Sequence, residues 1–348
     1  MNLDELLGQA LRCQADGRPF VVYRKPEAET VQALFQTDAT PYPVDFSAAG
    51  YVFAPFDGVP LWIPAAHAER HSASWKARPF VRASQVVMED AAAREHHVSL
   101  VRKGVEAIRD GRFDKVVLSR RQSMPVHDTD CTAVFRRMLD AYPEACVYLW
   151  WHPSSGYWMG AFAEQLAHVS GHYLTTMALA GTRVAGTTAE WGEKEQQEQR
   201  FVTEAIEEAL APFSKRISKG ETETITAGRL EHIRTMVLAA LREDVALEPL
   251  VYALHPTPAV CGRPKEAARD FILQEEGYDR QFYAGFHGEV NLGWQTDLFV
   301  NLRCLRWTET EAHLFIGGGI TADSDAEKEW EETVNKAGTM AAVLAVTK

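Results

Sequence analysis

Four glutamates in this chain have the spacing of ligands for a hard cation. Glu195 and Glu198 stand three residues apart near the start of one amphipathic stretch, and Glu329 and Glu332 repeat this spacing in another. Residues three apart share a helix face, so each pair should point in one direction. Inward carboxylates repel one another unless a divalent cation such as Mg²⁺ lies between them. For either pair alone, helix-dipole stabilisation and salt bridges at the rim remain alternatives.

The first stretch predicts a helix over about 192–213. At about 100° per residue, with Glu195 at zero, the apolar residues form one stripe and Glu198 falls inside it. That stripe contains Phe201, Val202, Ala205, Ile206 and Ala209. The remaining acids face away: Glu204, Glu207 and Glu208. Glu198 is therefore predicted to point inward.

The second stretch, "EKEWEETVNK", lies in a predicted helix from about 325 to 345. Glu329, Glu332 and Lys336 fall on one narrow face beside the apolar stripe. Two more acids fall on the opposite side and should face water: Glu327 and Glu331. Composition alone suggests a solvated charge run, but the helical geometry separates two inward acids from two outward ones.

Two cations lie in apolar strand patterns. In "FDKVVLSR", Lys115 shares a strand face with Phe113 and Val117. It either lies on an edge strand, where its charge prevents pairing with another chain, or is buried and can serve as a general base. Arg303 in "LFVNLRCLRW" either extends its guanidinium to water or binds a carboxylate.

The glycines of "IGGGI" (316–320) expose backbone amides that could bind an anion. Neither of the nucleotide-binding patterns GxGxxG and GxxxxGK[ST] occurs in the chain.

The composition limits the partners. The 348 residues carry a formal net charge of −12, which disfavours nucleic acid and anionic membranes. An acidic protein with an anionic substrate needs a metal ion or a few Lys and Arg side chains at its binding site.

The five cysteines are dispersed without a CxxC pair, and no HExxH motif occurs, so disulfides and zinc are not expected. Without a signal-peptide pattern or a long apolar run, we expect a cytoplasmic protein.

The elements that must position these residues are strand runs separated by single helices. This order predicts an α+β sandwich with mainly antiparallel sheets, in one domain over 1–348 whose first 90 residues are loop-rich. The expected helices cover 91–110, 192–213, 228–243, 264–275 and 325–345. The expected strands lie in 55–65, 113–124, 146–153, 156–163, 166–171, 173–181, 282–290, 296–307 and 311–320.

The order of seven motif blocks resembles the chorismate-utilising enzymes, and most closely the isochorismate synthases. The blocks are "FDKVVLSR", "LAGTRVAG", "KEQQEQRFV", "LHPTPAVCGRPKEAA", "FYAGFHGEV", "LRC" and "GGGITADSDAEKEWEETVNK". The resemblance covers about residues 95–345, while residues 1–90 match only loosely. It implies the fold of the anthranilate synthase component I type, with the active site at its centre.

The resemblance also implies roles for individual residues. Lys115 corresponds to the lysine that activates water for attack at C2 of chorismate, and Glu164 to the acid that protonates the departing C4 hydroxyl. Glu198 and Glu332 correspond to direct Mg²⁺ ligands, assisted by Glu195 and Glu329. Contacts to the substrate carboxylates fall to Arg303, Tyr283, Gly317 and Gly319. Further active-site positions are Thr182, His232 and Lys336.

The resemblance favours isochorismate as the product. Anthranilate synthases carry glutamine where Lys115 stands. Several salicylate synthases, which also eliminate pyruvate, have threonine at the position of Ala259. Aminodeoxychorismate synthases keep a lysine that can act as a nucleophile, and an inactive paralogue that binds a chorismate-like ligand is a non-enzymatic alternative. Many relatives of this size are monomers, and no obligate partner is expected.

Two blocks depart from the family pattern. The family's "GA[ST]PE" is "GAFAE" here, which affects the placement of Glu164. The usual "EH" is "EQ" at Glu198 and Gln199, which keeps the metal ligand and changes only its neighbour.

Overall fold

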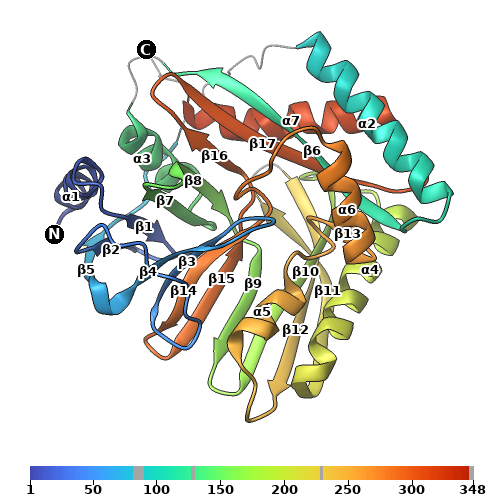
Figure 1. Cartoon of the computed structure of the whole chain (residues 1–348). Helices are drawn as coiled ribbons and strands as arrows, with labels where there is room; N and C mark the ends of the chain where they lie inside the picture. The colour runs from blue at the N-terminus through green and yellow to red at the C-terminus, as the bar shows by residue number, and fades with distance from the viewer. Residues whose placement is uncertain (81–89, 127–129, 228–229, 345–348) are drawn as a thin grey trace.

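The computed structural model describes residues 1–80, 90–126, 130–227 and 230–344, except six side chains: Thr182, Val184, Lys194, Ala227, Leu230 and Thr339. These residues form an α+β structure with two antiparallel sheets (Figure 1). The helices are α1 (Leu3–Ala15), α2 (Ala91–Arg109), α3 (Cys131–Ala141), α4 (Glu193–Leu210), α5 (Leu247–Leu254), α6 (Lys265–Glu275) and α7 (Ala326–Leu344), with short 3₁₀ turns at Ala65–His67 and Ala211–Phe213.

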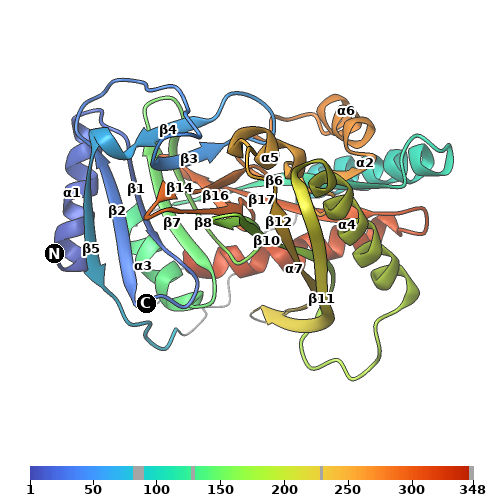
Figure 2. The same cartoon turned by 90° about the horizontal axis from the view of Figure 1, so that it is seen from below.

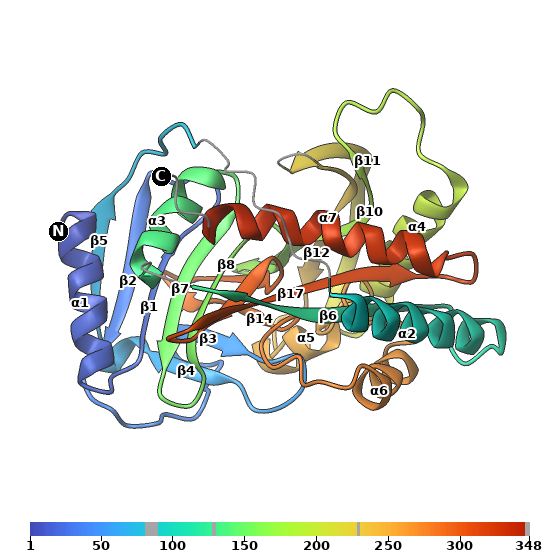
Figure 3. The ribbon, with the colours of Figure 1, turned by 90° about the horizontal axis from the view of Figure 1, so that it is seen from above.

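The first sheet has nine strands in the described residues, in the order β13-β6-β17-β16-β8-β7-β1-β2-β5. They are β13 (Gly262–Arg263), β6 (Lys115–Pro125), β17 (Glu311–Ile320), β16 (Cys304–Trp307), β8 (Gly156–Phe162), β7 (Cys146–His152), β1 (Phe20–Arg24), β2 (Thr30–Gln36) and β5 (Ala68–Ser74). Helices α1, α2, α3 and α7 lie across one face of this sheet, with α2 beside α7 (Figure 3).

The second sheet has eight strands in the same residues, in the order β11-β12-β10-β9-β15-β14-β3-β4. They are β11 (Ser214–Ala227), β12 (Leu230–Leu241), β10 (Tyr173–Val184), β9 (Gln165–Ser170), β15 (Gln295–Val300), β14 (Phe286–Leu292), β3 (Gly50–Ala54) and β4 (Leu61–Pro64). Helix α4 packs on β10 and β12. Figure 2 shows α1 at one end of the molecule, with α2 extending to the opposite end.

Side-chain alternation along β7 explains the two cores. Successive residues of a strand point to opposite faces. Tyr148 and Trp150 enter the core between the two sheets, where the Trp150 and Phe53 rings stack with centroids 4.8 Å apart. Val147 and Leu149 enter the second core, under α1, α3 and α7. Because both faces of β7 are covered, its sequence "CVYLWWH" is apolar almost throughout.

The predictions for most elements are confirmed, including the helices at α2, α4, α6 and α7. The helix predicted over 228–243 is wrong, because residues 230–241 form β12, which pairs with both β10 and β11. An apolar run of this length fits either element, and the two neighbouring strands decide it. The expectation of a loop-rich segment over 1–90 is also wrong, since it contains α1 and β1 to β5.

The single strand predicted over 296–307 is two strands in different sheets. The chain leaves β15 of the eight-stranded sheet and enters β16 of the nine-stranded sheet. Asn301 fixes this crossover, because its side chain accepts a hydrogen bond from the Tyr148 hydroxyl at 2.7 Å and donates one to the Phe282 carbonyl at 2.8 Å. Arg303, at φ 44°, lies at the crossover between the sheets.

Candidate active site

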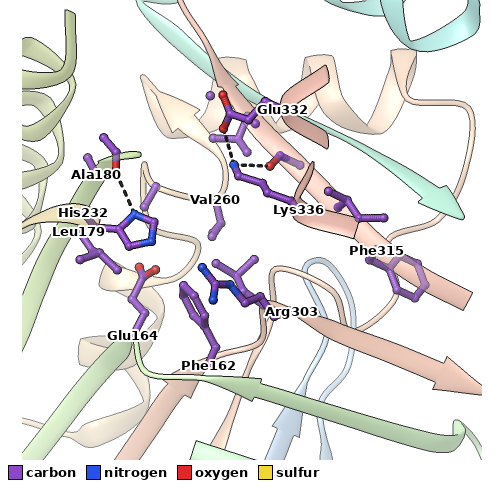
Figure 4. A pocket seen from close by; sticks show the side chains of 18 of the residues that line it. Phe162, Glu164, Leu179, Ala180, His232, Val260, Arg303, Phe315, Glu332 and Lys336 are labelled. Atoms are coloured by element: carbon purple, nitrogen blue, oxygen red, sulfur yellow. Dashed lines mark hydrogen bonds and ion pairs between the residues drawn. The ribbon is translucent and has the colours of Figure 1, made fainter. Parts of the chain in front are cut away.

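A cavity between the two sheets brings together residues from ten separate parts of the chain, from Val117 to Met340. Figure 4 shows Glu164, His232 and Arg303 directed to one space, with Glu332 and Lys336 on its other side. Eleven of the residues singled out from the sequence line this cavity: Glu164, Glu195, Glu198, His232, Ala259, Tyr283, Arg303, Gly317, Gly319, Glu332 and Lys336. Their sequence separation means that only the folded chain creates the site.

Lys115 is fully buried beside this cavity. It begins β6, which lies between β13 and β17, so the edge-strand interpretation is wrong. Its ammonium donates a hydrogen bond to Glu198 Oε1 at 2.6 Å. A Cβ built on Gly319 would lie 3.1 Å from Lys115 Cε and 2.8 Å from Glu198 Oε1. The glycine therefore leaves space for both side chains next to the cavity.

Glu164 follows β8 and is 3% exposed. Burial raises the pKa of its carboxyl from 4.5 to about 8, and the Lys115 ammonium opposes that rise. Desolvation penalises the charged form, so the carboxyl is mostly protonated at neutral pH. A buried, protonated carboxyl on the cavity wall is able to donate a proton. "GAFAE" thus places its glutamate in the cavity despite the departure from the family pattern.

Glu164→Gln is expected to raise the unfolding temperature more at pH 8 than at pH 5. The unfolded carboxyl ionises near pH 4.5 and the folded one near pH 8. The parent therefore loses about 1.4 kcal/mol per pH unit between these values, whereas glutamine does not titrate. Thermal unfolding of both proteins at both pH values measures the difference. The exposed Glu331→Gln serves as the control, and an equal gap at both pH values would contradict the raised pKa.

The four glutamates lie on two helices that face the glycine strand β17. Glu195 and Glu198 come from α4, while Glu329 and Glu332 come from α7. A Cβ built on Gly318 would lie 3.4 Å from Glu329 Oε2 and 4.0 Å from Glu332 Oε1. Both pairs therefore approach the same backbone segment from different helices.

The outward acids are also where the helical geometry predicts them. Glu327 forms an ion pair with Arg94 at 2.5 Å, and Glu331 is exposed. On α4, Glu204 and Glu208 both pair with Arg263, at 2.8 and 3.1 Å. Glu327, Glu204 and Glu208 thus pair with arginines at the surface, and these acids are not among the residues that line the cavity.

Hydrogen bonds hold three of the inward carboxylates in the described structure. Glu198 accepts from Lys115, Glu329 Oε1 accepts from the Ser324 hydroxyl at 2.7 Å, and Glu332 Oε1 accepts from Lys336 at 2.6 Å. Among the described residues, no three His, Cys, Asp or Glu side chains already converge as a metal site. The donor set still fits Mg²⁺, which prefers carboxylate oxygens and water, because acids of both helices flank Gly318 and Gly319.

Arg303 and Tyr283 line the part of the cavity that faces the nine-stranded sheet. The Arg303 guanidinium lies 5.1 Å from the centroid of the Phe162 ring. Tyr283 stacks on Phe315 with ring centroids 5.6 Å apart, and a Cβ on Gly317 would lie 2.6 Å from its hydroxyl. Burial raises the pKa of Tyr283, so the phenol stays neutral. Lys336 donates to the Gly317 carbonyl at 3.0 Å, which ties α7 to this wall.

His232 lies on β12 rather than on the predicted helix, and it reaches the cavity from there. Its Nδ1 donates a hydrogen bond to the Gly181 carbonyl at 2.9 Å. Burial lowers the pKa of the imidazole to about 4, so the ring is neutral at pH 7. The neighbouring Thr182 belongs to β10, but its side chain lies outside the described part of the structure.

The apolar wall of the cavity was not predicted. It is formed by Val117, Phe162, Leu179, Val260, Leu302, Phe315, Ile316 and Met340. Val260 and Leu302 lie in loops, and the other six residues lie in strands or helices whose apolar pattern predicts burial but not the neighbouring element. Alternation in 156–163 and 311–320 indicates which residues share a face, yet only the pairing of β8, β16 and β17 brings those faces together.

The comparison with known proteins identifies the class. The model of the family described as "Chorismate binding enzyme" matches residues 62–345. The chain therefore belongs to the chorismate binding enzyme family.

Two curated relatives cover about 70% of the chain. The salicylate biosynthesis isochorismate synthase of Pseudomonas aeruginosa is 33% identical over 268 residues, which are 73% of this chain and 56% of that protein. Isochorismate synthase MenF of Escherichia coli is 30% identical over 262 residues, 70% of this chain and 59% of that protein. The chain thus spans less than two thirds of either relative.

A solved structure shares the fold. The structure of MenF, the menaquinone-specific isochorismate synthase from Escherichia coli, superposes with a TM-score of 0.77 at 20% identity. The superposition covers 95% of this chain and 89% of that one. The predicted α+β fold is confirmed, and it extends through the N-terminal part that the sequence resemblance matched only loosely.

Proposed function

We propose that this chain is a Mg²⁺-dependent isochorismate synthase that converts chorismate to isochorismate. The observation that carries the proposal is the pairing, at one cavity, of a buried lysine with a buried carboxyl whose pKa is raised to about 8. A base and a protonated acid at one cavity suit addition of water and loss of a hydroxyl group. The names of the two curated relatives support the same reaction.

The reaction needs one proton accepted and one donated. To act as the base, Lys115 must first give up its ammonium proton; the amine then takes a proton from the water that attacks C2 of the ring. As the double bonds shift, Glu164 gives its proton to the C4 hydroxyl, which leaves as water. One water enters and one departs, so the conversion is an isomerisation. Because the acid is neutral before the step, no free hydroxide has to leave.

The remaining residues bind and orient the substrate. Arg303, Tyr283 and the amides of Gly317 and Gly319 would contact its carboxylates, with Lys336 holding the Gly317 carbonyl. Glu195, Glu198, Glu329 and Glu332 would hold Mg²⁺, which, when bound, supplies positive charge at the ring carboxylate. This charge and Arg303 meet the need for local cations in a protein of net charge −12.

Ala259 favours isochorismate as the final product. It lines the cavity, where its methyl group offers no hydroxyl to take part in a second, pyruvate-eliminating step. Salicylate formation is the alternative reaction, and anthranilate or aminodeoxychorismate formation would need ammonia in place of water.

No helix in the described residues is long and apolar enough to cross a membrane.

The proposal is tested by incubating the purified protein with chorismate and Mg²⁺ and separating the products by chromatography. Isochorismate is expected as the main product, and removal of Mg²⁺ with EDTA should stop its formation. Salicylate with pyruvate as the main products would overturn the proposal, as would an amino product that requires ammonia. Chorismate-dependent thermal stabilisation without any turnover would instead indicate a binding protein.

A further inference from the structure

A buried ion pair lies behind the wall of the cavity. Glu276 and Arg280 are each 2% exposed. Arg280 Nε donates to Glu276 Oε2 at 2.8 Å, and its Nη2 donates to Glu276 Oε1 at 2.5 Å. This is the two-pronged geometry that gives arginine and carboxylate pairs their directionality. Neither residue is among those that line the cavity.

The arginine also holds two segments that do line the cavity. Arg280 Nη2 donates to the Val117 carbonyl of β6 at 2.6 Å, and Nη1 donates to the Val260 carbonyl at 2.9 Å. Val117 itself donates its amide to the Cys261 carbonyl at 2.8 Å. The guanidinium therefore spans β6, which carries Lys115, and the loop that carries Ala259.

The Glu276 carboxylate also binds β6, at a second residue of that strand. Glu276 Oε1 accepts from the Ser119 amide at 2.7 Å and from the Ser119 hydroxyl at 2.9 Å. The guanidinium lies 5.7 Å from the centroid of the Tyr283 ring, which also lines the cavity. The pair thus contacts β6 at two residues, the Ala259 loop at one, and Tyr283 from behind.

We propose that Glu276 and Arg280 form a positioning pair, which fixes the distance between the strand that carries Lys115 and the loop that carries Ala259. This inference rests on the proposed function. A buried ion pair gains little stability over a well-packed apolar pair, but its directional hydrogen bonds restrict neighbouring segments to one arrangement. A shift of about 1 Å in reacting groups costs up to about 100-fold in rate.

Arg280→Lys tests this role because lysine keeps the charge and loses the planar fork. The expected result is a 10- to 100-fold lower kcat/KM for chorismate, with Mg²⁺ affinity by calorimetry within about twofold of the parent. The Mg²⁺ affinity should hold because, within the described structure, the side chain of Arg280 donates its hydrogen bonds to Glu276, Val117 and Val260 and not to the four inward glutamates.

Arg24→Lys is the matched control. Arg24 is also 2% exposed and also donates to backbone carbonyls, including those of Leu139 and Tyr142, neither of which lines the cavity of the proposed reaction. Both substitutions should lower the unfolding temperature, but only Arg280→Lys should lower kcat/KM at a temperature where both proteins are folded. A purely structural role would lower stability in both variants and kcat/KM in neither.

Glu276→Gln provides a second variant if Arg280→Lys does not fold, because its amide oxygen can still accept from Ser119. It should also lower kcat/KM, by less than Arg280→Lys does. Parent-like kcat/KM in whichever of the two variants folds would overturn the inference. The product assay of the parent is read first: a parent without isochorismate refutes the proposed function, whereas an active parent with equally active variants refutes only the positioning role.

Discussion

Lys115→Met should lower the turnover of chorismate by about 100- to 10,000-fold, the range expected for loss of a general base. The amine is fully buried and lies 2.6 Å from Glu198 Oε1, so bulk water or buffer cannot easily replace it. Methionine has a similar length and fits an apolar surrounding. Steady-state kinetics at saturating Mg²⁺, with circular dichroism to check the fold, measure the effect.

The loss of Lys115 has a second, separable consequence. Glu198 is partly buried and would lose its ammonium partner, and removal of one member of such an ion pair costs stability. The double variant Lys115→Met/Glu198→Gln should regain part of this stability and remain inactive. Lys103→Met is the control, because Lys103 is exposed on α2 and pairs with Glu275 at the surface. Turnover above a tenth of the parent's in Lys115→Met would exclude the lysine as the base.

The placement of the acids could be predicted from the sequence because it depends only on local geometry. Once 193–210 and 326–344 are helices, a rotation of about 100° per residue decides which glutamates face inward. The structure places Glu198 and Glu329 inward and Glu331 outward accordingly. The sequence also allowed two interpretations of Lys115, as an edge-strand residue or as a buried base. The order of strands in the sheet shows that it is buried.

Other features depend on contacts between distant segments, which no local pattern contains. Residues 230–241 became a strand because β10 and β11 flank them, and this pairing carries His232 to the cavity. Arg303 lies where the chain changes sheets, at a crossover fixed by Asn301 and Tyr148. The raised pKa of Glu164 results from its burial, which requires both sheets. Its role could be inferred from resemblance, but its chemistry could not.

Glu198→Gln and Glu332→Gln should each remove detectable turnover and weaken Mg²⁺ binding, while the fold stays intact. Glutamine keeps the shape and one acceptor oxygen, so Lys115 and Lys336 still have hydrogen-bond partners at these positions. Each substitution removes one negative charge from the four glutamates that would hold the cation. Mg²⁺ binds amide oxygens much less readily than carboxylates. Isothermal titration calorimetry with Mg²⁺ and steady-state kinetics measure the two effects separately.

The same two helices offer matched controls. Glu204→Gln on α4 and Glu331→Gln on α7 remove one charge from the same helix, but from its outward side. If net charge alone governed Mg²⁺ binding, all four variants would weaken it alike. If the inward carboxylates bind the cation, only Glu198→Gln and Glu332→Gln will lose affinity and turnover together. Unchanged Mg²⁺ affinity in both inward variants would refute the metal assignment, even if turnover fell, because the acids would then act only as partners of the two lysines.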